Sequence, residues 1–501
     1  MNEFPRGRPQ GGRFGLGPLL LAITLSVLWF LALRPAVDPD YGWHVENGRR
    51  VLDGTAFSGR DLYSWTATGD WVVHQWLTEA GMSTVHDSLG ASANSILAAL
   101  LWTTAFYLVA IRLRSRGFGW PSTILTVVLG FFCTMMSAGV RPQVLELVYL
   151  ASLLLLVDRY LTGSVGRRGF VALTVLLAVL WVNTHGSFPL LMAVTGLTAA
   201  GLLVAGNGHW RVMAAVTAAC MLAALLNPWG WTIYQFATQS TMSQPTLSMI
   251  EEWKRPQLLT GSLIPFVVAA LLAAAAATVR LLRRGEAPVG TRLRLDDVFI
   301  FLAMLYLGLS SGRHVMLFGI GAAPLIAWTL GAAGRWRLSV MTGRTVPVLP
   351  DRDAAARDRV NVGAALIVAA AILVLGWSVV NPRAQTSAVA VRYPVGLVNH
   401  LRSRVSSGSR MFNEYSWGGF LIEKGVTPVF IDGRSELYGD DQLLRYARIA
   451  RLAEGWARVL DSLGVDIAVM PRDSRLAVGL ARRGWIVAAE DSVGVVLERP
   501  E

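Results

Sequence analysis

The sequence predicts an α-helical polytopic membrane protein with about eleven transmembrane helices, followed by a small C-terminal α/β domain outside the cytoplasm. Three observations support this fold class. Of the 501 residues, 53% are hydrophobic and only 16% are charged, whereas ordinary soluble domains carry about 25% charged residues. Many apolar runs approach the ~20 residues that cross a bilayer as a helix. After residue 380 the composition becomes that of a small globular domain.

The first apolar run, residues 14–33, follows Arg6, Arg8 and Arg13 and resembles a secretory signal sequence. Its apolar stretch is long, however, and no small-residue cleavage site precedes Asp38. We therefore expect this run to be retained as the first span. The arginines before it place the N-terminus in the cytoplasm.

Ten further apolar runs follow. We expect spans at residues 91–111, 121–140, 144–157, 170–182, 188–205, 212–226, 263–279, 298–309, 315–330 and 362–380. The arginines between these runs gather in alternate loops, and cytoplasmic loops carry an excess of Lys and Arg. We therefore attribute the formal net charge of +12 to arginines in cytoplasmic loops, and we expect no nucleic-acid partner.

This topology divides the chain into two domains of a multi-pass protein of the cell inner (plasma) membrane. Residues 1–380 form the transmembrane domain, with a large first outer loop at residues 34–90, and residues 381–501 form the extracytoplasmic domain. Cys133 and Cys220 both lie within apolar runs, so neither a disulfide framework nor a thiolate metal site is expected.

Two carboxylates stand directly outside the first span, in the segment Asp38-Pro39-Asp40-Tyr41-Gly42-Trp43-His44. A charged group beside hydrocarbon is costly unless it faces water, a partner or a substrate. The pair is thus a candidate for general-base or metal chemistry on a substrate held at the bilayer surface. The alternative is that these residues only open a solvated loop.

The predicted topology also brings most of the polar side chains near span ends to the outer face. These residues are Asp38, Asp40, His44, His74, Arg141, His185, Glu251, Glu252, Arg313 and His314. Charged residues within the spans are scarce, which disfavours a transporter with a proton or ion pathway. We therefore expect one site at the outer face.

The tail is predicted as a small α/β domain. Short β-rich runs at residues 411–412, 428–431, 467–470 and 494–497 alternate with helical stretches such as residues 441–452. No phosphate-cradling glycine fingerprint is present, so nucleotide binding has little support.

Two polar segments follow consecutive predicted strands of the tail, at residues 413–419 and 432–438. Open α/β sheets bind ligands at the carboxyl ends of their strands. We expect Glu414, Asp432 and Arg434 to share one edge of a parallel sheet that faces the first outer loop as an acceptor or lid surface. The alternatives are that Gly and Asp form tight turns there, or that an Asp432–Arg434 pair only braces a turn.

Several further motifs are spread over nearly the whole chain. They are Asp38-x-Asp40-x-x-Trp43-His44, Gly48, Asp61-x-x-Ser64, Trp76-Leu77, Arg141-Pro142-Gln143, Trp181-x-Asn183-x-His185-Gly186, Asn227-Pro228-x-Gly230, Glu252-Trp253, Arg313, Asn413-Glu414-Tyr415-x-Trp417-Gly418-Gly419 and Asp432-Gly433-Arg434. With these motifs the chain resembles the GT-C superfamily of integral-membrane glycosyltransferases, and more closely a largely uncharacterised set of bacterial multi-pass proteins. It departs from that set at Gly42, where a second Trp is frequent, and at Gln75, where an acidic residue is frequent.

The resemblance implies sugar transfer from a polyprenyl-phosphate-linked donor, with an essential acidic residue in the first outer loop. Asp38 or Asp40 would be the catalytic base. The implied substrate-binding residues are His44, His74, Arg141, Gln143, Asn183, His185, Glu252, Arg313, His314, Glu414, Asp432 and Arg434. Of these, the two arginines at outer helix ends would hold the departing phosphate, and His185 or His314 would donate to it.

Simpler roles remain open for several of these side chains. Arg141 is equally well explained as an arginine that reaches the lipid headgroups, and His185 as a histidine bonded by neighbouring backbone. The tryptophans of the first outer loop would stack on sugar or anchor at the membrane interface. His44 and His74 would join the carboxylates around a divalent metal, but their spacing matches no specific metal motif.

The sequence therefore predicts a membrane glycosyltransferase that acts at the outer face of the bacterial inner membrane. Its partners would be a polyprenyl-phosphate sugar donor, a glycan, lipid or protein acceptor of the envelope, and membrane lipids. The alternative is a non-catalytic membrane protein that binds lipid-linked glycan or an envelope partner through its tail. The donor sugar, the acceptor and any metal requirement are not specified by the sequence.

Overall fold

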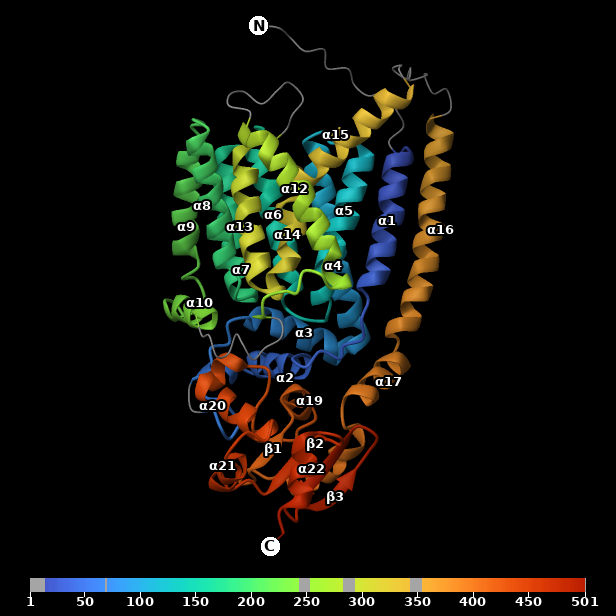
Figure 1. Cartoon of the computed structure of the whole chain (residues 1–501). Coiled ribbons are helices and arrows are strands. Elements are labelled where there is room, and N and C mark those ends of the chain that lie inside the picture. Colours follow the sequence, from blue (N-terminus) through green and yellow to red (C-terminus); the bar gives the residue numbers. More distant parts are fainter. Residues whose placement is uncertain (1–13, 68–69, 243–252, 283–292, 343–353, 501) are drawn as a thin grey trace.

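The computed structural model describes residues 14–67, 70–242, 253–282, 293–342 and 354–500. It contains a bundle of roughly parallel apolar helices and, at one end of that bundle, a polar layer that carries the C-terminal domain (Figure 1). The predicted combination of a helical membrane part and a small C-terminal sheet is confirmed at this level.

Each predicted span falls on a helix of the bundle, the tenth on the pair α14 and α15. The helices are α1 (Leu16–Ala32), α4 (Ala91–Ser115), α5 (Trp120–Thr134), α6 (Val144–Leu161), α7 (Arg167–Thr184), α8 (Pro189–Val204), α9 (Trp210–Ala223), α12 (Ile264–Leu282), α13 (Leu295–Ser310), α14 (Val315–Gly321), α15 (Ala323–Thr342) and α16 (Ala354–Val380). Within the described ranges, five helical segments are long and apolar enough to cross a membrane, or six if the bent α14–α15 pair counts as one span. The number eleven stays a prediction.

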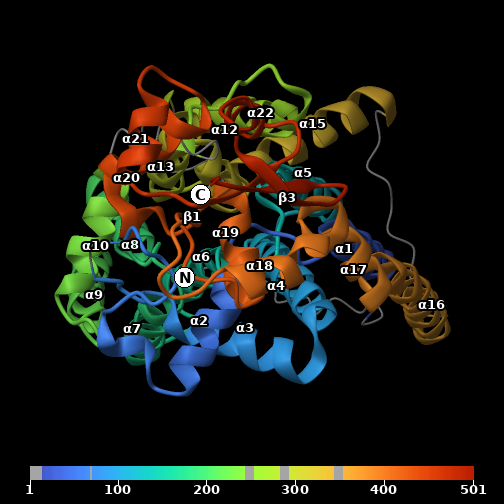
Figure 2. The same ribbon diagram turned by 90° about the horizontal axis from the view of Figure 1, so that it is seen from below.

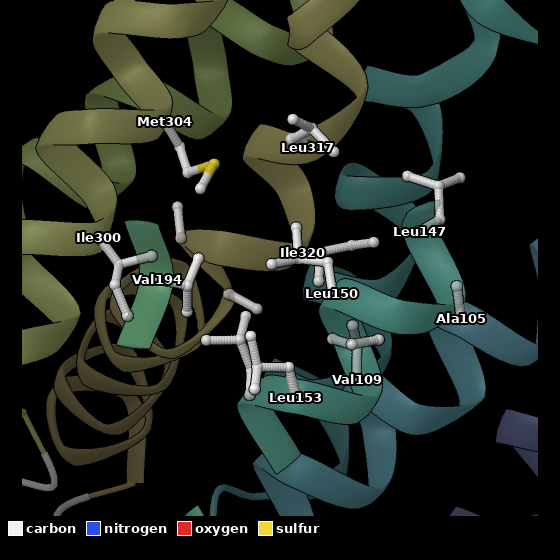
Figure 3. Packing of buried hydrophobic residues seen from close by; sticks show 14 of the residues in the cluster. Ala105, Val109, Leu147, Leu150, Leu153, Val194, Ile300, Met304, Leu317 and Ile320 are labelled. Atoms are coloured by element: carbon white, nitrogen blue, oxygen red, sulfur yellow. The ribbon is translucent and has the colours of Figure 1, made fainter. Parts of the chain in front are cut away.

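Helix α6 lies at the centre of the bundle core. Its Leu150 and Leu153 pack with Val109 of α4, Ile300 of α13 and Ile320 of α14, all of them buried (Figure 3). In contrast, α16 lies at the periphery beside α1 and buries little of its apolar surface (Figure 2). An apolar helix that is exposed on most sides suits a lipid environment.

Buried ion pairs join α4, α6 and α13 at the bundle end far from the tail. Arg112 Nε lies 2.9 Å from Asp158 Oδ2, and Arg116 Nη1 lies 2.7 Å from Asp297 Oδ2. All four side chains are buried. The charges therefore compensate one another within the helix packing, and Asp158 has a structural partner.

The first outer loop folds as two helices that lie across the end of the bundle (Figure 1). They are α2 (Tyr41–Leu52) and α3 (Trp76–Leu89), with a 3-10 turn at Ala56–Ser58. The remaining short elements near this end include α10 (Thr232–Met242) and 3-10 turns at Met135–Ser137, Gly261–Leu263 and Gly312–His314.

The tail contains short helices around a four-stranded sheet. Its elements are α17 (Pro382–Arg392), η6 (Val395–Leu397), α18 (Val398–Arg404), β1 (Met411–Asn413), η7 (Tyr415–Trp417), α19 (Gly418–Glu423), α20 (Ser435–Ala450), α21 (Trp456–Ser462), β2 (Ile467–Pro471), α22 (Arg475–Arg482), β3 (Ile486–Glu490) and β4 (Gly494–Glu498). The strand order is β1-β2-β4-β3; β1 and β2 are parallel, and the other pairs are antiparallel.

The predicted strand at residues 428–431 is wrong, and with it the expected parallel edge. This segment does not join the sheet. Val429 forms an isolated parallel bridge with Ser64 of the first outer loop, supported by hydrogen bonds to the backbone of Tyr63 and Trp65. The extended backbone at Val429 therefore finds its hydrogen-bond partners in the first outer loop, and this contact attaches the tail to the membrane part.

Candidate active site

A cavity of about 190 Å³ lies where the first outer loop, the bundle ends and the tail meet. It is lined by Asp40, Trp43, His44, Trp71, His74, Gln75, Arg141, Pro142, Gln143, Glu146, His185, Gly186, Ser187, Phe236, Ala237, Trp253, Arg313, His314, Gly433 and Glu436. Segments far apart in sequence therefore place carboxylates, imidazoles, guanidinium groups and aromatic rings around one space.

Asp40 faces this cavity, whereas Asp38 is occupied beside it. Asp40 precedes α2, and its Oδ1 accepts a hydrogen bond of 3.1 Å from Trp43 Nε1. The carboxylate of Asp38 accepts from Arg141 Nε and, at 3.0 Å, from the backbone N–H of Asp40. Burial raises the pKa of Asp38 and the neighbouring Arg141 opposes that rise. Of the two carboxylates, Asp40 is the one that a substrate in the cavity would contact.

The backbone of the tail lies directly against Asp40 at Gly433. A Cβ at Gly433 would lie 1.7 Å from Asp40 Oδ1, so any other residue would displace the carboxylate or the tail. A Cβ at Gly42 would likewise lie 2.2 Å from the backbone oxygen of Gly419 in α19. The absence of a bulky residue at Gly42 is therefore explained by direct contact between α2 and α19.

His44 lies on the same face of α2 as Asp40 and is held from behind. Its Nδ1 lies 3.0 Å from Glu79 Oε1 of α3, and the other oxygen of Glu79 accepts from Asn47 Nδ2. Glu79 is fully buried, and His44 is 3% exposed. With Nδ1 facing Glu79, Nε2 is the ring nitrogen on the cavity side.

Arg141 and Arg313 enter the cavity with different partners. Arg141 forms an ion pair with Asp38. Arg313, just before α14, lies over the ring of Trp253 at 5.0 Å. With the Gln143 amide turned so that its oxygen faces this guanidinium, that oxygen accepts from Nε at 3.2 Å and from Nη2 at 2.6 Å. Because Gln143 is neutral, this contact orients the guanidinium of Arg313 without neutralising it.

His185 stands where the chain turns from α7 to α8. Its extended backbone ends α7, and the N–H of Ser187 donates to His185 Nδ1 at 3.2 Å, with Ser187 Oγ at 2.7 Å. A neutral His185 that accepts at Nδ1 carries its proton on Nε2. Glu146 at the start of α6 lies 3.5 Å from the same Nδ1.

The remaining two cavity histidines are neutral at pH 7. Burial lowers the pKa of His74 to about 4, and its ring stacks on Phe236 at 4.3 Å. Burial together with Arg313 lowers the pKa of His314 to about 4. These two rings therefore add polar surface to the cavity but no charge.

Several predicted site residues lie elsewhere. Asn183 accepts from Trp76 Nε1 at 2.8 Å and donates to the backbone oxygens of Val179 and Leu226, so it braces α7. Glu414 bonds Tyr446 within the tail at 3.1 Å. Neither residue lines the cavity, and Glu252 lies outside the residues that the structure describes.

Asp432 and Arg434 form a buried joint between the tail and the first outer loop. Arg434 donates to both oxygens of Asp432, at 2.9 and 2.7 Å, and to Asp61 Oδ1 at 2.6 Å. Its guanidinium also lies over the rings of Tyr63 and Trp71. Although burial disfavours the charged form, Arg434 holds the pKa of Asp432 below its usual range. Arg434 contacts the first outer loop through Asp61, but Asp432 and Arg434 lie in the joint and not in the cavity lining.

The tail reaches the cavity instead through Gly433 and Glu436. Glu436 lies in the first turn of α20, and burial raises the pKa of its carboxyl group. Glu79, Glu146 and Glu436 were not among the predicted site residues. Glu436 follows the predicted Asp432-Gly433-Arg434 motif directly, whereas Glu79 gives no signal apart from its place in the first turn after Trp76.

The described residues contain no group of three or more His, Cys, Asp or Glu side chains arranged to hold a metal ion. Gln75 lines the cavity, and its Nε2 lies 3.5 Å from His44 Nδ1. Trp43 and Trp71 line the cavity, while Trp65 packs on Phe430 of the tail. These tryptophans therefore serve the site and the joint.

No protein-family model matches the chain, and no curated protein matches it in sequence. Solved structures do match its fold. The archaeal oligosaccharyltransferase AglB from Archaeoglobus fulgidus, in complex with an inhibitory peptide and a dolichol-phosphate, aligns with TM-score 0.56 and 11% identity over 90% of this chain and 69% of its own. The arabinofuranosyltransferase AftD from Mycobacteria aligns with TM-score 0.51 and 17% identity over 96% of this chain and 39% of its own.

Both neighbours are membrane glycosyltransferases of the GT-C superfamily, so the predicted GT-C-like fold is confirmed. The present chain spans well under half of AftD. At these identities the likeness establishes the arrangement of the helices alone.

Proposed function

We propose that this protein is a membrane glycosyltransferase that transfers a sugar from a polyprenyl-phosphate-linked donor to an envelope acceptor at the outer face of the inner membrane. One observation carries the proposal. The carboxylate of Asp40 and the guanidinium of Arg313 line the same cavity at the end of an apolar bundle. The partner of Arg313, the amide of Gln143, is neutral and leaves its charge in place.

The donor would lie with its prenyl chain along the apolar helices and its phosphate in the cavity. Arg313 can hold a phosphate through two parallel N–H donors, and Gln143 and Trp253 fix the plane of its guanidinium. The Nε2–H of His185 supplies a further donor. The aromatic rings of Trp43, Trp71 and Phe236 offer apolar faces for the sugar.

Asp40 would act as the general base. As the acceptor hydroxyl oxygen forms its bond to the anomeric carbon, its proton passes to the Asp40 carboxylate. The bond between that carbon and the phosphate oxygen breaks, and the lipid phosphate leaves with the electron pair. A positioned base contributes about 10²–10⁴-fold to such a reaction, and donors aimed at the departing phosphate stabilise its growing charge.

Asp38 has a different role in this proposal. Its ion pair with Arg141 and its bond from the Asp40 backbone fix the turn that carries Asp40. Side chains of this protein carry out each step described above. The two histidines considered for a divalent metal, His44 and His74, have other contacts. His44 Nδ1 faces Glu79, and His74 stacks on Phe236.

The experiment is incubation of the purified protein in lipid nanodiscs with radiolabelled polyprenyl-phosphate sugars and envelope acceptors. Transfer of label that is lost in Arg313→Gln supports the proposal. Arg404→Gln is the matched control, because Arg404 lies exposed in the tail and pairs with Glu498. Binding of donors without turnover in the wild-type protein would instead favour a non-catalytic glycan-binding protein.

A further inference from the structure

Glu79 and His44 form a deeply buried contact between two titratable side chains of the first outer loop. Glu79 is 0% exposed and His44 is 3% exposed, on two different helices. In the described part of the chain, no arginine or lysine forms an ion pair with Glu79. One of its oxygens is hydrogen-bonded to His44 Nδ1, and the other accepts from Asn47 Nδ2.

A buried pair that carries no net charge avoids the cost of an uncompensated ion. For Glu79 and His44 two such forms exist: a carboxylate with an imidazolium, or a carboxylic acid that donates to Nδ1 of a neutral ring. In both states His44 carries a hydrogen on Nε2, the nitrogen on the cavity side.

The same conclusion holds for His185, which also lines the cavity: the Ser187 N–H donates to Nδ1 and leaves the proton of a neutral ring on Nε2. The cavity therefore presents two fixed imidazole N–H groups in addition to Arg313. Such a set of rigid donors suits an anionic group with several oxygens, such as a phosphate monoester.

We propose that Glu79 is a positioning residue that makes His44 a fixed N–H donor for the phosphate of the lipid-linked substrate. This inference rests on the proposed function for the identity of the anion. Glu79 does not touch the substrate; it acts by setting the tautomer and the orientation of the His44 ring.

The test uses four variants in nanodiscs and farnesyl phosphate as a short polyprenyl monophosphate probe. Glu79→Met removes both hydrogen bonds at similar volume, whereas the amide of Glu79→Gln can accept from Asn47 and donate to His44 Nδ1. His44→Phe removes the cavity N–H, and His44→Gln restores one. Glu46→Met is the control, because Glu46 lies on the same helix, pairs with Arg49 and does not line the cavity.

We expect Glu79→Met and His44→Phe each to weaken farnesyl phosphate binding about tenfold, the loss of one charge-assisted hydrogen bond. Glu79→Gln, His44→Gln and the control should stay within about threefold of the wild type. The double variant Glu79→Met/His44→Phe should bind no more weakly than His44→Phe, because Glu79 acts through His44. Histidine ¹⁵N NMR should show a protonated Nε2 at His44 in the wild type and in Glu79→Gln.

Additive losses in the double variant, a His44 Nε2 without hydrogen in the wild type, or wild-type binding by His44→Phe would each overturn the inference. If Glu79→Met fails to fold, the NMR signal and the comparison of His44→Gln with His44→Phe still decide. Because the probe carries no sugar, the binding result is independent of turnover. Absent transfer with the expected binding pattern refutes the proposed function alone, whereas transfer with unchanged binding refutes only the role of Glu79.

Discussion

Arg434 is predicted to be the main fastening between the tail and the first outer loop, and Arg434→Met tests this directly. The side chain is 1% exposed and donates three hydrogen bonds to two carboxylates, those of Asp432 and Asp61. Both carboxylates are themselves buried. Removing the guanidinium therefore leaves two buried negative charges that no longer have this partner.

Breaking one buried ion pair by removing a partner costs about 3–5 kcal/mol. Tyr438, which donates to Asp432 at 2.6 Å, remains in the variant and compensates part of the loss. We therefore expect the free energy of opening the joint to fall by about 3–5 kcal/mol in total. Amide exchange at residues 61–66 and 428–434 should accelerate by roughly a hundredfold to a few thousandfold.

The assay is native-state hydrogen exchange read by mass spectrometry, with Arg404→Met as the matched control. Arg404 makes the same two-pronged contact, with both oxygens of Glu498 at 2.9 and 2.6 Å, but it is solvent-exposed. Exposed pairs contribute little, so this variant should leave exchange in the tail near the wild-type rate. The reasoning is refuted if Arg434→Met accelerates exchange no more than Arg404→Met does.

Three further predictions concern the site and the topology. Gly433→Ala should lower the rate of transfer by about a hundredfold, because a Cβ there meets Asp40 Oδ1. Gly408→Ala is the control, because Gly408 has open space around it. Equal activity of the two variants would show that the contact between Gly433 and Asp40 does not matter for transfer. The protein should lose stability as the pH falls from about 6.5 towards 4, because His74 in the unfolded chain binds a proton that the folded residue, with a pKa of about 4, does not. The melting temperature of His74→Gln should therefore differ less between pH 7 and pH 5 than that of the wild type. An equal difference in the two proteins would contradict this role of His74. In a Cys133→Ala/Cys220→Ala background, Ser406→Cys should react with an impermeant thiol reagent in intact cells and Ser164→Cys only after permeabilisation; the reverse pattern would invert the topology.

The sequence predicted the helical bundle well, for a physical reason. In hydrocarbon the backbone N–H and C=O groups of a long apolar run find partners only when the run forms a helix. The positions of the spans therefore follow from the composition and length of each run. The tail was predicted less accurately. Residues 428–431 have the composition of a strand, but their backbone partner is the first outer loop around Ser64, and local composition does not reveal a partner more than 350 residues away.

The candidate site shows the same division. Asp40 and His44 are four residues apart at the start of α2, so their joint placement follows from helix geometry. Asn183 and His185 belong to one motif of the sequence, but α7 ends between them: His185 lines the cavity, and Asn183 stays within the helix packing. The contact between Glu79 and His44 depends on how α3 packs against α2, which no local pattern encodes.

In the proposed reaction Asp40 is the base, and Asp38 is its structural support. The most direct measurement is the rate of transfer from a labelled polyprenyl-phosphate sugar by Asp40→Asn, together with farnesyl phosphate binding by the same protein. We predict that transfer falls by about 10²–10⁴-fold while farnesyl phosphate binding stays within about threefold of the wild type. Full transfer activity in Asp40→Asn would show that Asp40 is not the base.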